Sequence, residues 1–198
     1  MTHPRRLVLL SLLATLAVPA VWAADAPTEI SGVRFEPRVQ LGGHSLVLNG
    51  LGLRARSILK GYAAGLYLSQ RTTAADQAVA QAGPKRLQIR MMLDVPVAEF
   101  VKAFHKGVDR NTPVDQHAGL ADRMAAFDAQ MQPLGKVHTG DTVTLDYVPG
   151  KGMVMTHNGK VTGDAIPGAD FYSAILLIFL GDKPVDDRLK QGLLGQPA

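Results

Sequence analysis

Arg54 is the residue of this sequence that most needs a chemical explanation. It lies within LNGLGLRARSILKGYAAGLYL, residues 48–68, which is otherwise rich in aliphatic residues and glycine. A guanidinium in an apolar interior needs a partner, because an unpaired buried ion is strongly destabilising. No Asp or Glu occurs between residues 37 and 75, so the partner must come from a distant part of the chain or from a ligand. The alternative places Arg54 and Arg56 together at a solvent-exposed turn.

Two tyrosines in the same stretch, Tyr62 and Tyr67, are candidate companions of Arg54. A buried tyrosine hydroxyl normally has a hydrogen-bond partner, so either one could donate to an anion that the guanidinium holds. Five positions separate them, so in a regular strand they point to opposite faces and only one shares a face with Arg54. A two-residue loop at residues 55–56 would select Tyr67, whereas one more loop residue would select Tyr62.

Other chemical motifs find no support in the sequence. Gly50 and Gly52 lack the third glycine of a dinucleotide fingerprint and lead into another strand, and no GxxxxGK[ST], HExxH or GxSxG string occurs. His105 and Asp109 share a helix face but lie among Lys and Arg residues, which indicates a solvated charged face. The chain has no cysteine, which excludes disulfides and thiolate catalysis. We therefore predict neither a metal site nor a cofactor.

The elements that would position Arg54 follow from the hydrophobic periodicity. The order of strands and helices has no regular βαβ repeat, so it predicts an α+β fold, with a mainly antiparallel sheet and helices layered on one face. The expected strands are residues 33–35, 46–53, 58–68 and 87–93, followed by a hairpin of 141–148 and 152–161; the expected helices are 73–82, 97–108, 120–131, 166–181 and 186–194.

The N-terminus, residues 1–23, has the pattern of a secretory signal peptide. Arg5 and Arg6 precede an apolar run, and small residues suit cleavage after Ala23. The run is shorter than the about 20 residues of a membrane span, so we expect no span after cleavage. Residues 24–198 would then form a single domain, periplasmic or secreted. The net charge is +4, or +2 once the two leader arginines are lost, and it does not favour a nucleic-acid partner.

The late apolar helix offers a second group of candidates. Phe171, Ile175 and Phe179 could line an apolar cavity, although their spacing alone is more typical of core residues. This helix lies in GDAIPGADFYSAILLIFLGDKPVDDRLKQGLLG, residues 163–195. Together with GLGLRARSILKGYAAGLYL, it resembles the chalcone isomerase-like family, most closely its bacterial exported branch. The resemblance spans roughly residues 30–195.

The resemblance implies an open-faced β-sandwich in which helices cover one side of a large antiparallel sheet. Arg54 matches the arginine of the family's Gly-x-Arg element, which lies in a cleft between sheet and helices. In the plant enzymes that arginine is linked with the phenolate oxygen of a chalcone, and in the fatty-acid-binding relatives an arginine and a tyrosine hold the carboxylate. Tyr62 stands where the plant enzymes carry a threonine associated with a catalytic water, which is a departure from the enzyme pattern.

We therefore expect a binding protein rather than an enzyme. Its ligand would be a small amphipathic carboxylate or phenol, such as a fatty acid, held by Arg54 with Tyr62 or Tyr67 and enclosed by Phe171, Ile175 and Phe179. One alternative is an isomerase that closes a chalcone-like phenol by oxa-Michael addition, with Arg54 stabilising the oxyanion. Another is an envelope protein-interaction role with a vestigial cleft. A filled cleft and an Arg54 paired to a protein carboxylate would favour that last role.

Overall fold

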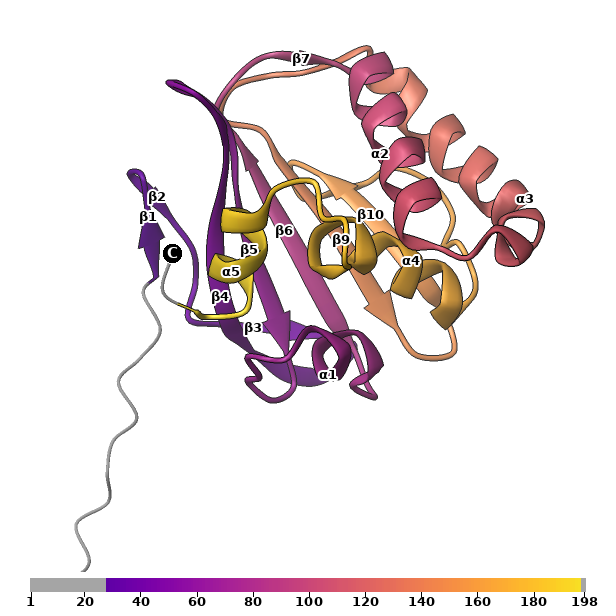
Figure 1. Ribbon diagram of the computed structural model, residues 1–198, viewed down its shortest axis with the longest axis horizontal. Coiled ribbons are helices and arrows are strands. Elements are labelled where there is room, and N and C mark those ends of the chain that lie inside the picture. Colours follow the sequence, from indigo (N-terminus) through magenta and orange to yellow (C-terminus); the bar gives the residue numbers. More distant parts are fainter. Residues whose placement is uncertain (1–27, 197–198) are drawn as a thin grey trace, which may run out of the picture.

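A seven-stranded antiparallel sheet forms the centre of the structure, a computed structural model that describes residues 28–196 (Figure 1). The predicted leader, residues 1–23, lies outside the described residues. The strand order across the sheet is β11-β10-β9-β6-β5-β4-β3. The bounds of these strands are β3 Arg38–Leu41, β4 His44–Arg56, β5 Leu59–Leu68, β6 Lys85–Met91, β9 Thr142–Val148, β10 Gly152–His157 and β11 Lys160–Val161.

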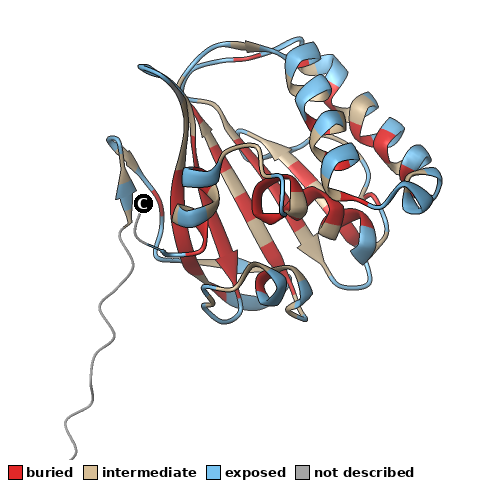
Figure 2. Cartoon of the chain, in the orientation of Figure 1, coloured by how far each residue is buried: buried red, intermediate tan, exposed pale blue. Residues whose placement is uncertain are grey.

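Helices cover one face of this sheet. The main core lies between the sheet and α2 (Val97–Asn111), α3 (Val114–Met131) and α4 (Ala169–Leu180). Figure 2 shows the buried residues concentrated on the sheet and on α4, the most apolar helix of the described chain. The α+β fold with helices on one face, predicted from the sequence, is confirmed. None of the helices in residues 28–196 has the length and apolar character that crossing a membrane requires.

The other face of the sheet is only partly covered. A second, smaller cluster packs there around Phe35, beside the short hairpin of β1 (Glu29–Ile30) and β2 (Val33–Arg34). The rest of this face carries polar side chains, including an Arg86–Asp146 pair with two hydrogen bonds of 2.6 Å. The remaining elements are α1 (Ala75–Ala80), β7 (Val95–Pro96), the 3-10 helix η1 (Gln132–Leu134), β8 (Lys136–Val137) and α5 (Asp187–Leu193).

Two glycines of β4 let α5 lie directly against the strand. A Cβ atom on Gly50 would collide with the backbone of α5 at Gly192, and one on Gly52 would lie 2.6 Å from the side chain of Leu189. Glycine thus replaces larger side chains of β4 where another backbone approaches closely. The start of α5 is thereby held beside β4.

We predict that Gly52→Ala destabilises the protein by about 1–3 kcal/mol, because the added methyl group must push α5 away from β4. Gly119→Ala is the matched control, since Gly119 lies in the middle of α3 on its solvent-exposed face and nothing would lie within 4 Å of its new Cβ. This control should gain about 0.5–1 kcal/mol from helix propensity. Urea unfolding measures both values, and equal effects of the two variants would contradict the packing account.

Candidate ligand-binding site

The pairing of β4 with β5 decides which tyrosine accompanies Arg54. The turn between these strands is Ser57–Ile58, two residues later than the 55–56 loop that would have selected Tyr67, and Arg56 pairs with Leu59. The register then shifts, because Gly61 is an extra residue in β5, and Arg54 pairs directly with Tyr62. Residues directly opposite each other in an antiparallel pair share a face. Tyr62 is therefore the neighbour of Arg54 on the helix-covered face.

Tyr67 lies on the opposite face of the sheet. Its ring belongs to the smaller cluster around Phe35, and its hydroxyl donates to the backbone carbonyl of Glu36 at 3.0 Å. Burial there raises the pKa of Tyr67 to about 12. Of the two tyrosines that the sequence analysis left open, the structure brings only Tyr62 together with Arg54.

Asp186, far along the chain, is the partner of Arg54. The Nη1 group of Arg54 donates to Oδ2 of Asp186 at 3.1 Å. The other carboxylate oxygen, Oδ1, accepts from the backbone N–H of Leu189 at 3.0 Å and so caps the N-terminus of α5. The side chains of Arg54 and Asp186 are 32% and 16% exposed, so water only partly screens the pair. One carboxylate thus joins β4 to the start of α5.

A cavity of about 300 Å³ opens beside this ion pair, between the sheet and the helices. This volume is at the lower end of the usual range for small-molecule sites. Its walls come from β4, β5, β6, β7, β9, α2, α3, α4 and the segment before α5. The lining residues are Arg54, Gly61, Tyr62, Ile89, Val95, Glu99, Phe100, Ala103, Phe104, Phe127, Leu145, Ile178, Phe179 and Val185.

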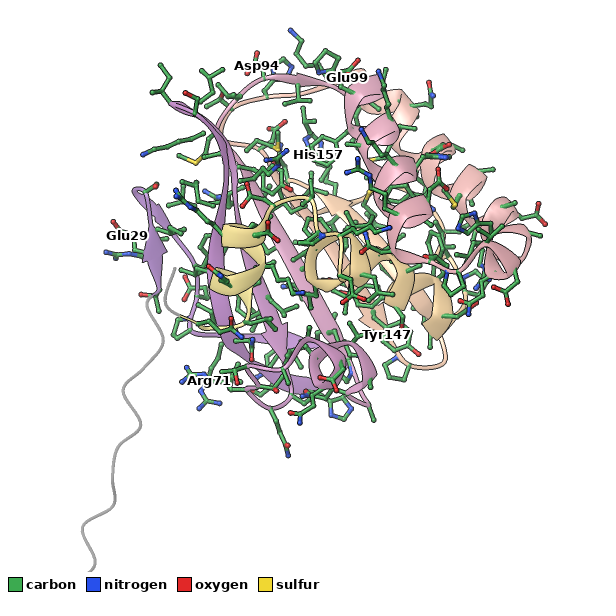
Figure 3. The ribbon with its side chains drawn as sticks, in the orientation of Figure 1. Glu29, Arg71, Asp94, Glu99, Tyr147 and His157 are labelled. Atoms are coloured by element: carbon green, nitrogen blue, oxygen red, sulfur yellow. The ribbon has the colours of Figure 1, made fainter. Side chains whose placement is uncertain are left out.

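The cavity has a polar end and an apolar end. The polar groups are the guanidinium of Arg54, the hydroxyl of Tyr62 and the carboxylate of the exposed Glu99, which Figure 3 places beside the start of α2. The buried lining is aliphatic or aromatic, and Phe104 stacks on Phe127 with ring centroids 4.1 Å apart. An amphipathic molecule with one polar head fits this division of surfaces.

Three of the predicted site residues line the cavity, namely Arg54, Tyr62 and Phe179. Phe171 and Ile175 are fully buried in the main core and are not among the lining residues. Phe171 lies two helical turns, and Ile175 one turn, before the residues of α4 that reach the cavity, Ile178 and Phe179.

The sequence analysis missed the contribution of α2. A helix over residues 97–108 was predicted from hydrophobic periodicity, but its Phe100 and Phe104 were not predicted to line the cavity. Amphipathic spacing identifies the face that turns toward the sheet, but it does not separate residues that line a cavity from residues that fill the core.

The Tyr62 hydroxyl has no hydrogen-bond partner among residues 28–196, although its ring is half-buried against Phe100 with centroids 6.5 Å apart. Burial raises the pKa of Tyr62 above its ordinary value; the nearby Arg54 cation opposes this shift and Asp186 adds to it. Tyr62 is consequently a neutral phenol at physiological pH and offers a hydrogen-bond donor inside the cavity.

Arg54 also retains donors for a ligand. Its hydrogen bond to Asp186 uses one of the several N–H groups of the guanidinium, whose planar fork can hold a second acceptor. The described residues contain no group of three or more His, Cys, Asp or Glu side chains placed to hold a metal ion. The site can therefore bind and orient a polar head through Arg54 and Tyr62.

Comparison with known proteins identifies the family to which the chain belongs. The model of the chalcone isomerase-like family matches residues 27–195. A crystal structure of a fatty-acid binding protein from Arabidopsis thaliana superimposes with a TM-score of 0.64 at 15% sequence identity, covering 83% of this chain and 93% of that one. At this identity the likeness establishes the fold. No curated protein sequence matches the chain.

We predict that Asp186→Asn destabilises the protein by about 1 kcal/mol, because Asn still caps α5 but no longer pairs with the Arg54 charge. Asp186→Ala should cost about 1 kcal/mol more, since the cap is lost as well. Asp187→Asn removes the same charge from the first turn of α5 and is the control. Urea unfolding gives the three values; if Asp186→Asn and Asp187→Asn behave alike, the ion pair contributes nothing.

Proposed function

The chain belongs to the chalcone isomerase-like family, and we propose that it is a member that binds a small amphipathic acid, such as a fatty acid, without converting it. The observation that carries this proposal is the cavity itself. It joins one cation and one free phenol hydroxyl to an aliphatic and aromatic interior. Those are the surfaces that a carboxylate head and a hydrocarbon tail require.

The head of the ligand would share Arg54 with Asp186. A carboxylate seated beside the guanidinium accepts from the N–H groups that Asp186 leaves unused, and Tyr62 donates a further hydrogen bond. Asp186 and the exposed Glu99 both repel a second anion, so the ion pair lowers affinity for small hydrophilic acids. Burial of an apolar tail must then supply much of the binding free energy. This balance favours fatty acids over short polar acids.

The Arg54–Asp186 pair argues against the ring-closing isomerase. That reaction needs a cation to stabilise an oxyanion in the transition state, and a carboxylate already neutralises Arg54. The same pair is one feature expected of a vestigial cleft. The open cavity of about 300 Å³ beside it is the opposite of a filled cleft, however, and favours a retained binding site.

We further propose that the protein is exported, as a periplasmic protein of a bacterium. The support is the sequence pattern of residues 1–23, with its basic start, apolar run and small residues before Ala24. In that compartment the protein would hold acyl chains in transit through water.

We predict that the purified protein binds dodecanoate and that Arg54→Met weakens binding about tenfold to a hundredfold, the value of a charge-assisted hydrogen bond of about 1.5–3 kcal/mol. Tyr62→Phe should weaken it about fivefold, because a neutral hydrogen bond contributes about 1 kcal/mol. Isothermal titration calorimetry gives the affinities, and native mass spectrometry after gentle purification should detect bound acidic lipid.

Tyr67→Phe and Arg90→Met are the matched controls, since both residues lie outside the cavity lining. Their affinities for dodecanoate should equal that of the wild type. Dodecanol, which has the same tail without the charge, should bind at least about ten times more weakly than dodecanoate. If Arg54→Met binds dodecanoate as tightly as the wild type does, or if dodecanoate and dodecanol bind equally well, Arg54 does not bind the carboxylate.

We predict that a Gram-negative host exports the full chain and removes residues 1–23, because a peptidase cuts after small residues at the exit of the apolar run. The intact mass of the protein from the periplasmic fraction should correspond to a chain that begins at Ala24. Ala23→Arg should block this cleavage. Retention of the full-length mass by the wild-type protein would contradict the proposal of a cleaved leader.

A further inference from the structure

The tip of the β4–β5 hairpin is an exposed apolar surface. Ile58 is 91% exposed and Leu59 is 59% exposed, and the hairpin projects beyond the sheet in Figure 1. Leu93, 37% exposed, follows β6 beside the same hairpin, where the backbone N–H of Met92 donates to Gly61 at 2.9 Å. These are three of the five exposed large hydrophobic residues in the described chain. We call Ile58, Leu59 and Leu93 the apolar tip.

The turn at this tip lacks the residue types that usually form two-residue hairpin turns. Two-residue hairpin turns favour Gly, Asn and Asp, which adopt positive φ and remain polar in water. Here Ser57 takes the positive φ of 56° and the next position is Ile58, a β-branched aliphatic residue. No described residue covers Ile58, so the folded chain gains nothing from placing it there. A local preference broken without structural gain indicates a functional surface.

The charged residues that flank the turn of the apolar tip in the sequence are both basic. In the sequence, Arg56 precedes the turn and Lys60 follows it, and no Asp or Glu occurs between residues 37 and 75. The nearest acid along the β6–β7 loop is Asp94, which already accepts from Thr139 and contacts His138 at 3.2 Å. Exposed aliphatic side chains flanked by cations are the combination that binds an anionic lipid surface.

The apolar tip lies close to the polar lining of the cavity. Gly61 and Tyr62 follow Lys60 directly in β5, Arg54 lies opposite Tyr62, and all three line the cavity. Asp94 and Glu99, which flank β7, lie at the same end of the molecule (Figure 3). A surface bound at the tip therefore lies next to the polar end of the cavity.

We propose that the β4–β5 hairpin docks on an anionic membrane surface, with Ile58 and Leu59 inserted among the lipids and Lys60 at the headgroups. Docking in this orientation brings the polar end of the cavity close to the bilayer, where fatty acids partition. The docking surface stands on its own observations, and only the transfer of acyl chains between bilayer and cavity rests on the proposed function.

Sedimentation with lipid vesicles tests the docking. The ligand-free mature chain, residues 24–198, should bind vesicles of phosphatidylglycerol and phosphatidylcholine in equal parts, and bind pure phosphatidylcholine at least about tenfold more weakly. The double variant Ile58→Ser, Leu59→Ser should reduce binding to the anionic vesicles by at least about tenfold. Lys60→Gln should reduce it about fivefold, and added salt should reduce it further.

Val114→Ser is the matched control. Val114 is 82% exposed at the start of α3, beyond the far end of α2, and a 15-residue helix is about 22 Å long. This variant should bind anionic vesicles like the wild type. Circular dichroism checks that all variants fold.

The proposal is overturned if the wild type does not bind anionic vesicles, if it binds neutral vesicles equally well, or if the double variant binds anionic vesicles as tightly as Val114→Ser does. Light scattering gives the oligomeric state. If the wild type is a dimer that does not bind vesicles, and the double variant is a monomer, the tip would instead be assigned to contact with a second copy of the chain. Fatty acid is left out of the vesicle assay, so failure of dodecanoate binding and failure of docking are separate results.

Discussion

The ion pair between Arg54 and Asp186 is the interaction on which the site depends. It spans 132 residues of sequence and joins β4 to the first turn of α5. Because the same carboxylate caps α5, the pair fixes both the helix and the segment before it, including Val185 in the cavity wall. The glycines of β4 bring α5 close enough for this contact. A guanidinium in an otherwise apolar strand is thus held in place by the distant end of the chain.

The pair also limits which ligands fit. Because its side chain is 32% exposed and already paired with Asp186, Arg54 attracts an anion less strongly than an isolated buried cation would. If the ligand is a fatty acid, as proposed, the apolar interior, where Phe104 stacks on Phe127, would supply most of the attraction for its acyl chain. In the proposed complex, Arg54 and the neutral hydroxyl of Tyr62 would set the orientation of the head. The same balance favours binding over oxyanion chemistry.

The sequence predicted the fold and part of the site, and the limits have physical causes. Hydrophobic periodicity and the resemblance of two stretches located the sheet, the helices and Arg54. The choice between Tyr62 and Tyr67 depended on one extra residue, Gly61, in the pairing of β4 with β5, and single-residue register shifts have no signature in composition. The sequence placed Asp186 at the start of the last helix. Its contact with Arg54 could not be predicted, because it depends on how distant parts of the chain pack together. The helix α2 was predicted, but hydrophobic periodicity did not identify which of its residues line the cavity.

A crystal structure of the protein with dodecanoate tests the central claim most directly. The account predicts carboxylate density within hydrogen-bond distance, about 2.7–3.2 Å, of both the Arg54 guanidinium and the Tyr62 hydroxyl, with Asp186 still paired to Arg54. The hydrocarbon tail of dodecanoate should run between Phe104 and Phe179 into the apolar end of the cavity. Density for the acid outside this cavity, or a head that contacts neither Arg54 nor Tyr62, would contradict the account.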